Sequence, residues 1–212
     1  MPIFVQQLST TFAGANQNPL SEGGNWQANT NSGIMRPSQL SSHQAVQVAA
    51  SGALQSKGWW VGGPSLSNDQ YCEITVGTVL PDNASFIGAC ICAVNAVDTQ
   101  YEVVVRGPLG ATAALIVAKR IAAVQTVLGS IFTTTVNAGD KVMIAKQGTN
   151  LTVYLNRVQV TGVGAISDSS LTSGISAFLI QSATGTVGIP GFSAGSVVGA
   201  VPNSLMMLGV GS

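Results

Sequence analysis

The chain has 212 residues, of which only 8% are Asp, Glu, Lys or Arg, and eight basic residues balance eight acidic ones. A net charge of zero excludes the broad positive field that attracts nucleic acid or an anionic membrane surface. It also predicts poor solubility for a lone monomer. We therefore expect a homo-oligomer or a subunit packed in a larger assembly.

The N-terminus, Met1–Gln7, has neither the basic region nor the apolar run of a secretion signal. Gly, Ser and Pro interrupt every apolar stretch before about 18 residues are reached, so no membrane span is predicted. The three cysteines, Cys72, Cys90 and Cys92, lie in strand-like runs and are expected to be buried reduced thiols. A zinc site is not predicted, because His43 is the single histidine and lies far away in sequence.

Residues 1–36 are rich in Asn, Gln, Ser, Thr and Gly, and Thr11-Phe12 and Trp26 are their expected anchors in a core. From His43 onward, short runs rich in Val, Ile, Thr, Tyr and Phe end at Gly, Pro, Asn or Asp, which is typical of strands. The predicted strands are 44–50, 70–78, 86–94, 101–106, 114–119, 124–128, 131–136, 141–146, 151–155, 157–160 and 175–181. Regular short strands of this kind predict a sandwich or a barrel.

Two stretches predict hairpins. Residues 111–127 contain alanines that would suit a helix, but their β-branched residues and the flanking Gly110 and Gly129 favour two strands that meet near 119–121. Residues 142–155 alternate on either side of a turn in which Gly148 and Asn150 tolerate positive φ.

The C-terminal part differs in composition, because no charged residue follows Asp168. Residues 1–182 are predicted to form the sandwich, and residues 183–212 an irregular Gly/Val/Ser-rich extension. The apolar side chains of this extension need cover, so we expect it to pack on a neighbouring subunit or along the edge of its own domain. Its expected contact residues are Phe192, Leu205, Met206, Met207 and Leu208.

From about Thr11 to Ile180, the order of features resembles the concanavalin-like lectin/glucanase jelly rolls, particularly the laminin-G-like modules of phage structural and bacterial surface proteins. The matching segments are Thr11-Phe12 with Trp26, then 68–74, 101–105, 139–142 followed by 151–156, and 171–175. Arg157 departs from the pattern, since many relatives place Gly after the Asn of this turn. The resemblance implies an all-β jelly roll of two antiparallel sheets of about six or seven strands each, packed face to face.

Glycosidases with this fold use paired carboxylates on one strand, and no such cluster exists here. Glu73 and Glu102 stand alone on separate strands and are expected to face solvent. The resemblance also implies calcium as the usual cofactor, but the pairs Asn68-Asp69 and Asp82-Asn83 are expected to form turns. The sequence thus predicts a protein that is not an enzyme and has no catalytic residues, metal or cofactor.

Trp59 and Trp60 are candidate contact residues. Adjacent strand residues face opposite sides, so one ring is expected in the core and the other at a subunit contact or under a sugar ring. Lys119-Arg120 is expected to be solvated.

These observations predict a structural component of a phage virion, such as a capsid decoration or tail-associated protein, assembled in the host cytoplasm. Its partners would be copies of itself and other particle proteins, with no nucleic acid or membrane. The alternative is a lectin-like carbohydrate-binding module that recognises surface glycans.

Overall fold

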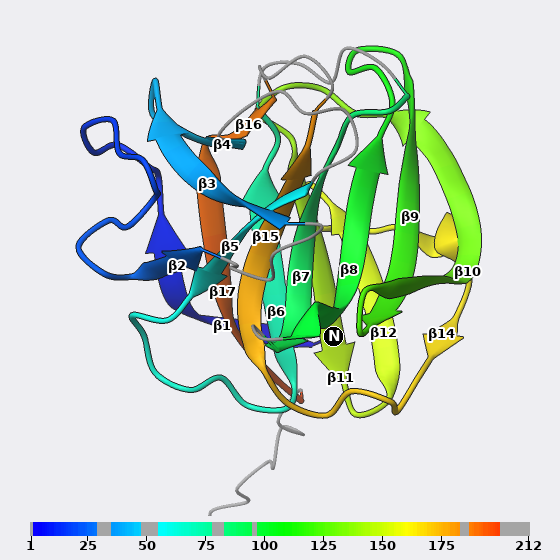
Figure 1. Ribbon diagram of the computed structural model, residues 1–212. Helices are drawn as coiled ribbons and strands as arrows, with labels where there is room; N and C mark the ends of the chain where they lie inside the picture. Colours follow the sequence, from blue (N-terminus) through cyan, green and yellow to red (C-terminus); the bar gives the residue numbers. More distant parts are fainter. Residues whose placement is uncertain are drawn as a thin grey trace, which may run out of the picture.

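The computed structural model describes residues 2–28, 35–47, 55–77, 83–94, 97–182 and 187–199. Two β-sheets pack face to face over these residues (Figure 1). The all-β jelly-roll sandwich predicted from the sequence is thereby confirmed. Among the described residues, no helix is long and apolar enough to span a membrane.

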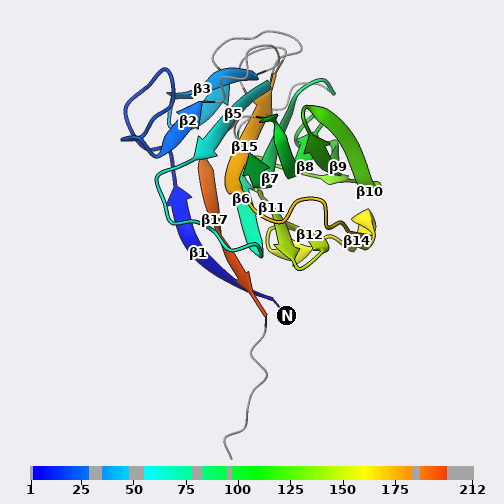
Figure 2. The same ribbon diagram turned by 60° about the horizontal axis from the view of Figure 1, so that its bottom comes forward.

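The first sheet has seven strands and unites the two ends of the described chain, since β1 and β17 run side by side (Figure 2). The order is β1-β17-β6-β11-β12-β13, with β14 also paired to β12. The bounds are β1 Ile3–Thr10, β6 Gln70–Thr75, β11 Lys141–Gln147, β12 Asn150–Leu155, β13 Val158–Gln159, β14 Ile166–Ser167 and β17 Gly191–Val198.

The second sheet has ten strands in the order β10-β9-β8-β7-β15-β5-β3-β4-β16, with β2 also paired to β5. Between described strands, β3 and β5 pair in parallel and the other pairs are antiparallel. The bounds are β2 Trp26–Ala28, β3 Met35–Ser41, β4 Gln44–Gln47, β5 Gln55–Trp60, β7 Phe86–Val94, β8 Thr99–Arg106, β9 Thr112–Ile121, β10 Val124–Thr135, β15 Ile175–Gln181 and β16 Gly188–Ile189. A 3₁₀ turn, η2 at Thr161–Val163, follows β13.

The core lies between the two sheets, where alternate strand residues point inward. Ile74 on β6 and Val103 on β8 are both fully buried there. At one end of the core, aromatic rings form a cluster in which Trp26 lies 4.9 Å from both Trp60 and Phe178, measured between ring centroids. Phe12 also belongs to it, so the predicted anchoring of Phe12 and Trp26 is confirmed.

The boundary of the sandwich differs from the expected one. Strand β17 lies between β1 and β6, so residues 187–199 belong to the sandwich, whereas an extension was expected from residue 183. Small residues made this strand look like a loop in the sequence. Gly195 is needed there, because a Cβ at this position would collide with the carbonyl oxygen of Val5 on β1. Residues 200–212, including Leu205, Met206, Met207 and Leu208, lie outside the described residues, so their packing stays a prediction.

The region 111–127 forms a hairpin, as predicted, but its turn lies at Ala122-Ala123. Both alanines have positive φ, 48° and 70°, which is the backbone of a tight two-residue turn. The two strands expected at 124–128 and 131–136 are one long strand, β10. Its pairing register with β9 shifts between Leu128 and Phe132, so β10 consists of two arms.

Candidate functional site

The outer face of the seven-stranded sheet holds an open cavity of about 600 Å³. We call it the open cavity; β1, β6, β11, β17 and the chain around residues 11–22 contribute to its wall. Its charged side chains are two acids and two bases, so the local charge is balanced. Those charged residues are Glu22, Glu73, Lys141 and Arg157, and the hydroxyl and amide side chains are Gln6, Ser9, Thr10, Thr11, Thr75 and Ser193.

Glu73 lies in the wall of the open cavity and is 4% exposed. Each of its carboxylate oxygens accepts a hydrogen bond of 3.2 Å from Arg157, one from Nε and one from a terminal nitrogen. Lys141 Nζ lies 3.7 Å from the same carboxylate, and Ser193 on β17 lies opposite Glu73 in the sheet. Burial, and secondarily the charge of Glu73, raises the pKa of the neighbouring Tyr71 to about 12.

Arg157 reaches Glu73 because of the turn between β12 and β13. Asn156 and Arg157 both have positive φ, 51° and 65°, so the pair forms a tight hairpin turn. Arginine thus occupies a left-handed position that glycine would fill without strain. Its hydrogen bonds to Glu73 raise the pKa of Arg157 and hold the side chain at the cavity rim.

Glu22 belongs to a second part of the cavity wall. One carboxylate oxygen accepts a 3.0 Å hydrogen bond from the Thr10 hydroxyl, and the other accepts a 2.8 Å bond from Trp26 Nε1. The second bond ties the cavity to the aromatic cluster of the core. Both carboxylates of the cavity are therefore held in fixed positions.

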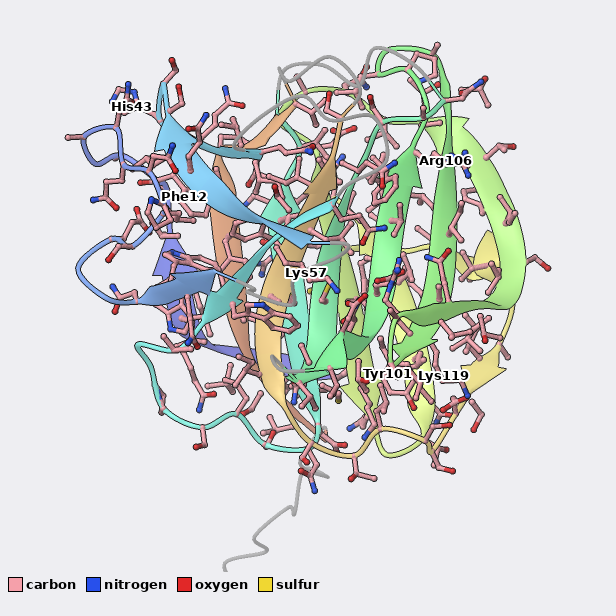
Figure 3. All side chains as sticks on the ribbon, viewed as in Figure 1. Phe12, His43, Lys57, Tyr101, Arg106 and Lys119 are labelled. Atoms are coloured by element: carbon pink, nitrogen blue, oxygen red, sulfur yellow. The ribbon has the colours of Figure 1, made fainter. Side chains whose placement is uncertain are left out.

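The outer face of the ten-stranded sheet carries a second polar group, which we call the buried network: Lys57, Asp98, Gln100, Glu102, Arg120 and Gln125. Lys57 on β5 (Figure 3) donates to Asp98, and Arg120 on β9 lies 3.7 Å from Asp98 and 3.2 Å from Glu102. The amides of Gln100 and Gln125 donate to Glu102 at 2.7 and 2.5 Å. The side chains of the three ion pairs are at most 7% exposed.

Strand register explains how the network assembles. Arg120 on β9 lies opposite Gln100 on β8 and Gln125 on β10, so the three side chains share one face. Glu102 lies two residues from Gln100 on the same face. Within the network, Gln100 Oε1 and Asp98 Oδ2 have no hydrogen-bond partner, and neither has Nε1 of Trp59, whose ring lies near Lys57.

The two tryptophans lie on opposite sides of β5, as expected, but neither exposes a ring. Trp60 is 8% exposed and stacks on Phe192 in the core, while Trp59 is fully buried on the outer face, where Lys57 Nζ lies 5.3 Å from its ring centroid. The expectation of an accessible tryptophan is wrong, because the Trp59 ring packs in a buried apolar cluster with residues such as Ala177 and Leu179 of the neighbouring strand β15. Phe192 is likewise buried and packs in the aromatic cluster, and it also contributes to the wall of the open cavity.

Three other expectations about charged residues are also wrong. Glu73 and Glu102 do not face solvent, and Lys119-Arg120 is not freely solvated. Lys119 lies 2.7 Å from Asp168, which also accepts a hydrogen bond from the Tyr101 hydroxyl. Although burial opposes it, the bonds from Lys119, Tyr101 and Ser170 hold the pKa of Asp168 well below its usual range.

Of the two Asp-Asn pairs predicted to form turns, the structure fully describes Asn68-Asp69. Asp69 accepts a 2.7 Å hydrogen bond from the backbone N–H of Gly148, while Asp82 lies outside the described residues. Within the part of the chain that the structure describes, no group of three or more His, Cys, Asp or Glu residues could hold a metal ion.

The open cavity could not be recognised from the sequence. Its charged residues come from the N-terminal loop, β6, β11 and the β12–β13 turn, which are far apart along the chain. The sequence does not show which distant residue a single Glu or Arg will pair with, because no fixed spacing connects the two. Arg157 in a turn that favours glycine was the one available hint.

No protein family model and no curated protein sequence matches this chain. Solved structures share its fold at low sequence identity. The carbohydrate-binding module CBM66 from Bacillus subtilis has a TM-score of 0.54 and 10% identity, over 84% of this chain and 96% of that one. The β-glucanase of Bacillus licheniformis has a TM-score of 0.55 and 7% identity, over 91% of this chain and 99% of that one. An endo-β-galactosidase from Clostridium perfringens has a TM-score of 0.56 and 8% identity, over 90% of this chain and 62% of that one.

The concanavalin-like jelly-roll class expected from the resemblance is confirmed as a fold. The prediction that the protein is not an enzyme is contradicted, because glycoside hydrolases are among the structures that share the fold. Non-enzymes share it as well, so the fold by itself assigns neither role. The expected role as a phage virion component and the expected localisation remain predictions.

Proposed function

We propose that the protein binds carbohydrate and that the open cavity is the binding site. The observation that carries the proposal is the cavity itself, about 600 Å³ in volume and lined by hydroxyl, amide and charge-balanced ionic side chains. Sugar hydroxyls both donate and accept hydrogen bonds, so such a lining suits them. The likeness in fold to a carbohydrate-binding module supports this reading.

The fixed carboxylates would serve as acceptors for sugar hydroxyls. Glu73 and Glu22 are each held by at least two partners, so little side-chain entropy is lost when they bind a ligand. Lys141 and Arg157 are about half exposed and can donate from the rim. Balanced charge favours a neutral glycan over a strongly anionic one.

The buried network fits a ligand less well. Lys57 and Glu102 are fully buried, and all the charged groups of the network are already paired with one another. A sugar would have to displace ion pairs in a desolvated environment, at a cost of several kcal/mol. The open cavity requires no such rearrangement.

A glycan array followed by isothermal titration calorimetry tests the proposal. We expect a neutral oligosaccharide to bind the wild-type protein, and Glu73→Gln and Arg157→Ala each to weaken binding about tenfold or more, the loss of one charge-assisted hydrogen bond. Arg106→Ala is the matched control, since Arg106 is exposed on the other sheet. Absence of glycan binding, or equal binding by all three variants, would contradict the proposal.

A further inference from the structure

Exposed apolar side chains gather at one side of the sandwich. On β10, Val124 is 70% exposed, Ile131 57% and Val127 48%, and Val158 on β13 is 70% exposed. Ile121, at the hairpin end of β9, is also exposed. Surface apolar residues are usually scattered singly, so a group of five along one side indicates a contact surface.

The two sheets meet at this side. β10 ends the ten-stranded sheet and β13 ends the main path of the seven-stranded sheet (Figure 1). Phe132 on β10 and Val158 on β13 line one groove of about 330 Å³, together with Leu155 and Val160. The turn η2 closes the groove, since a Cβ on Gly162 would collide with the Phe132 ring. We call β10 and this groove, which share Phe132, the β10 side.

The β10 side lacks most of the features that protect edge strands. From Ile121 to Ala138 the sequence contains no charged residue and no proline. Two features protect part of the strand: the bulge between Leu128 and Phe132, where Gly129 has a φ of 70°, and the close approach of Val163, whose carbonyl oxygen a Cβ on Gly129 would meet. Long uncharged edge strands pair readily with another chain. The bulge restricts such pairing to one arm of β10 at a time.

We propose that the β10 side is the interface with a second copy of this chain, related by a two-fold axis. β10, residues 121–123 and residues 158–162 supply about 20 residues, the lower end of the 20–30 that each partner contributes to a stable interface. Two copies of an uncharged surface meet without repulsion, and a self-complementary patch suits two-fold symmetry. The arm Val124–Leu128 pairs with its counterpart, and apolar side chains enter the groove beside Phe132.

Sedimentation velocity on the full chain tests this interface. The wild-type protein is expected to sediment as a dimer at about 10 µM, and Val124→Lys/Val127→Lys as a monomer, because the substitutions place a charge on each face of the arm that pairs. Val61→Lys is the control: Val61 is 45% exposed, comparable to Val127, but lies in the loop after β5. It is expected to remain a dimer.

Hydrogen exchange on the wild-type protein gives a measurement that needs no substitution. Backbone amides of residues 124–128 are expected to exchange at least tenfold more slowly at high protein concentration than after dilution, whereas amides of β1, an end strand of the other sheet, do not change. A wild-type monomer at about 100 µM overturns the proposal. A dimer that survives the double lysine substitution, with no slowing in residues 124–128, overturns it as well.

Discussion

Each outer face of the sandwich carries a glutamate–arginine ion pair, and the two pairs differ in their exposure to water. On the seven-stranded sheet, Glu73 pairs with Arg157, whose side chain is 54% exposed. On the ten-stranded sheet, Glu102 pairs with Arg120, whose side chain is 7% exposed. Both contacts are 3.2 Å long, so distance alone does not distinguish them. The exposure of the two arginine side chains distinguishes them.

Hydration decides what each pair contributes. An exposed cation keeps its water, so a pair such as Glu73–Arg157 contributes about 0–1 kcal/mol to stability and leaves donors for a ligand. A desolvated pair such as Glu102–Arg120 depends on every partner, because removing one leaves a buried charge uncompensated, which costs about 3–5 kcal/mol. One face therefore provides a binding surface and the other a structural network.

The largest expected effect is that of Arg120→Met. It removes the cation that Glu102 and Asp98 share, and we expect a loss of about 3–5 kcal/mol in the free energy of unfolding. Urea denaturation measures this loss. The matched variant Arg157→Met on the other face should lose about 1 kcal/mol or less. Equal losses in the two variants would show that the faces do not differ in desolvation.

Asp168→Asn comes next. The folded-state pKa of Asp168 is depressed, so its ionised form stabilises the fold above the unfolded-state value of about 3.9, and this stabilisation is lost as the pH falls through the folded-state pKa. We expect a loss of about 2 kcal/mol near pH 7, from the bonds of Tyr101 and Lys119, and a smaller difference from wild type at low pH. Thermal unfolding between pH 7 and pH 2 checks the sign. A constant difference would exclude the linkage.

Glu73→Gln should have a smaller effect on stability, about 1 kcal/mol or less, since its cationic partners are half exposed. A spectroscopic change should accompany it. The charge of Glu73 contributes to the raised pKa of Tyr71, about 12, so the substitution should lower that pKa part of the way toward the ordinary tyrosine value of about 10. Ultraviolet titration of tyrosinate follows this shift. If the pKa of Tyr71 did not change, the charge of Glu73 would not contribute to its raised value.

Thiol labelling tests whether the face of the buried network opens locally. Burial raises the pKa of both Cys90, which lies opposite Glu102 on that face, and Cys72 in the core. We expect neither thiol to react with a disulfide reagent at pH 8 in the native protein, and both to react at the same rate, set by unfolding. Faster reaction of Cys90 would show that this face opens, and would make it a second candidate surface for a ligand.

Strand positions after residue 70 followed well from β-branched residues and turn residues, because each signal is local. Gly148 and Asn150 marked the β11–β12 hairpin, and the observed turn lies there. Strands β1 and β17 were not predicted, and β5 was expected only at its end, at Trp59 and Trp60. Their glutamines, serines and glycines give weak signals, and their pairing with distant partners is what forms them.

The sequence by itself determined the all-β class, the aromatic anchors Phe12 and Trp26 and the burial of the cysteines, since alternation and side-chain apolarity act over a few residues. Tertiary structure alone decided which charges are hydrated. Glu73 and Glu102 are both buried, but the fold gave Glu73 a half-exposed arginine partner at an open cavity and Glu102 a buried arginine partner within a desolvated network. Charge interactions depend on distance and on the surrounding water, and the fold fixes both.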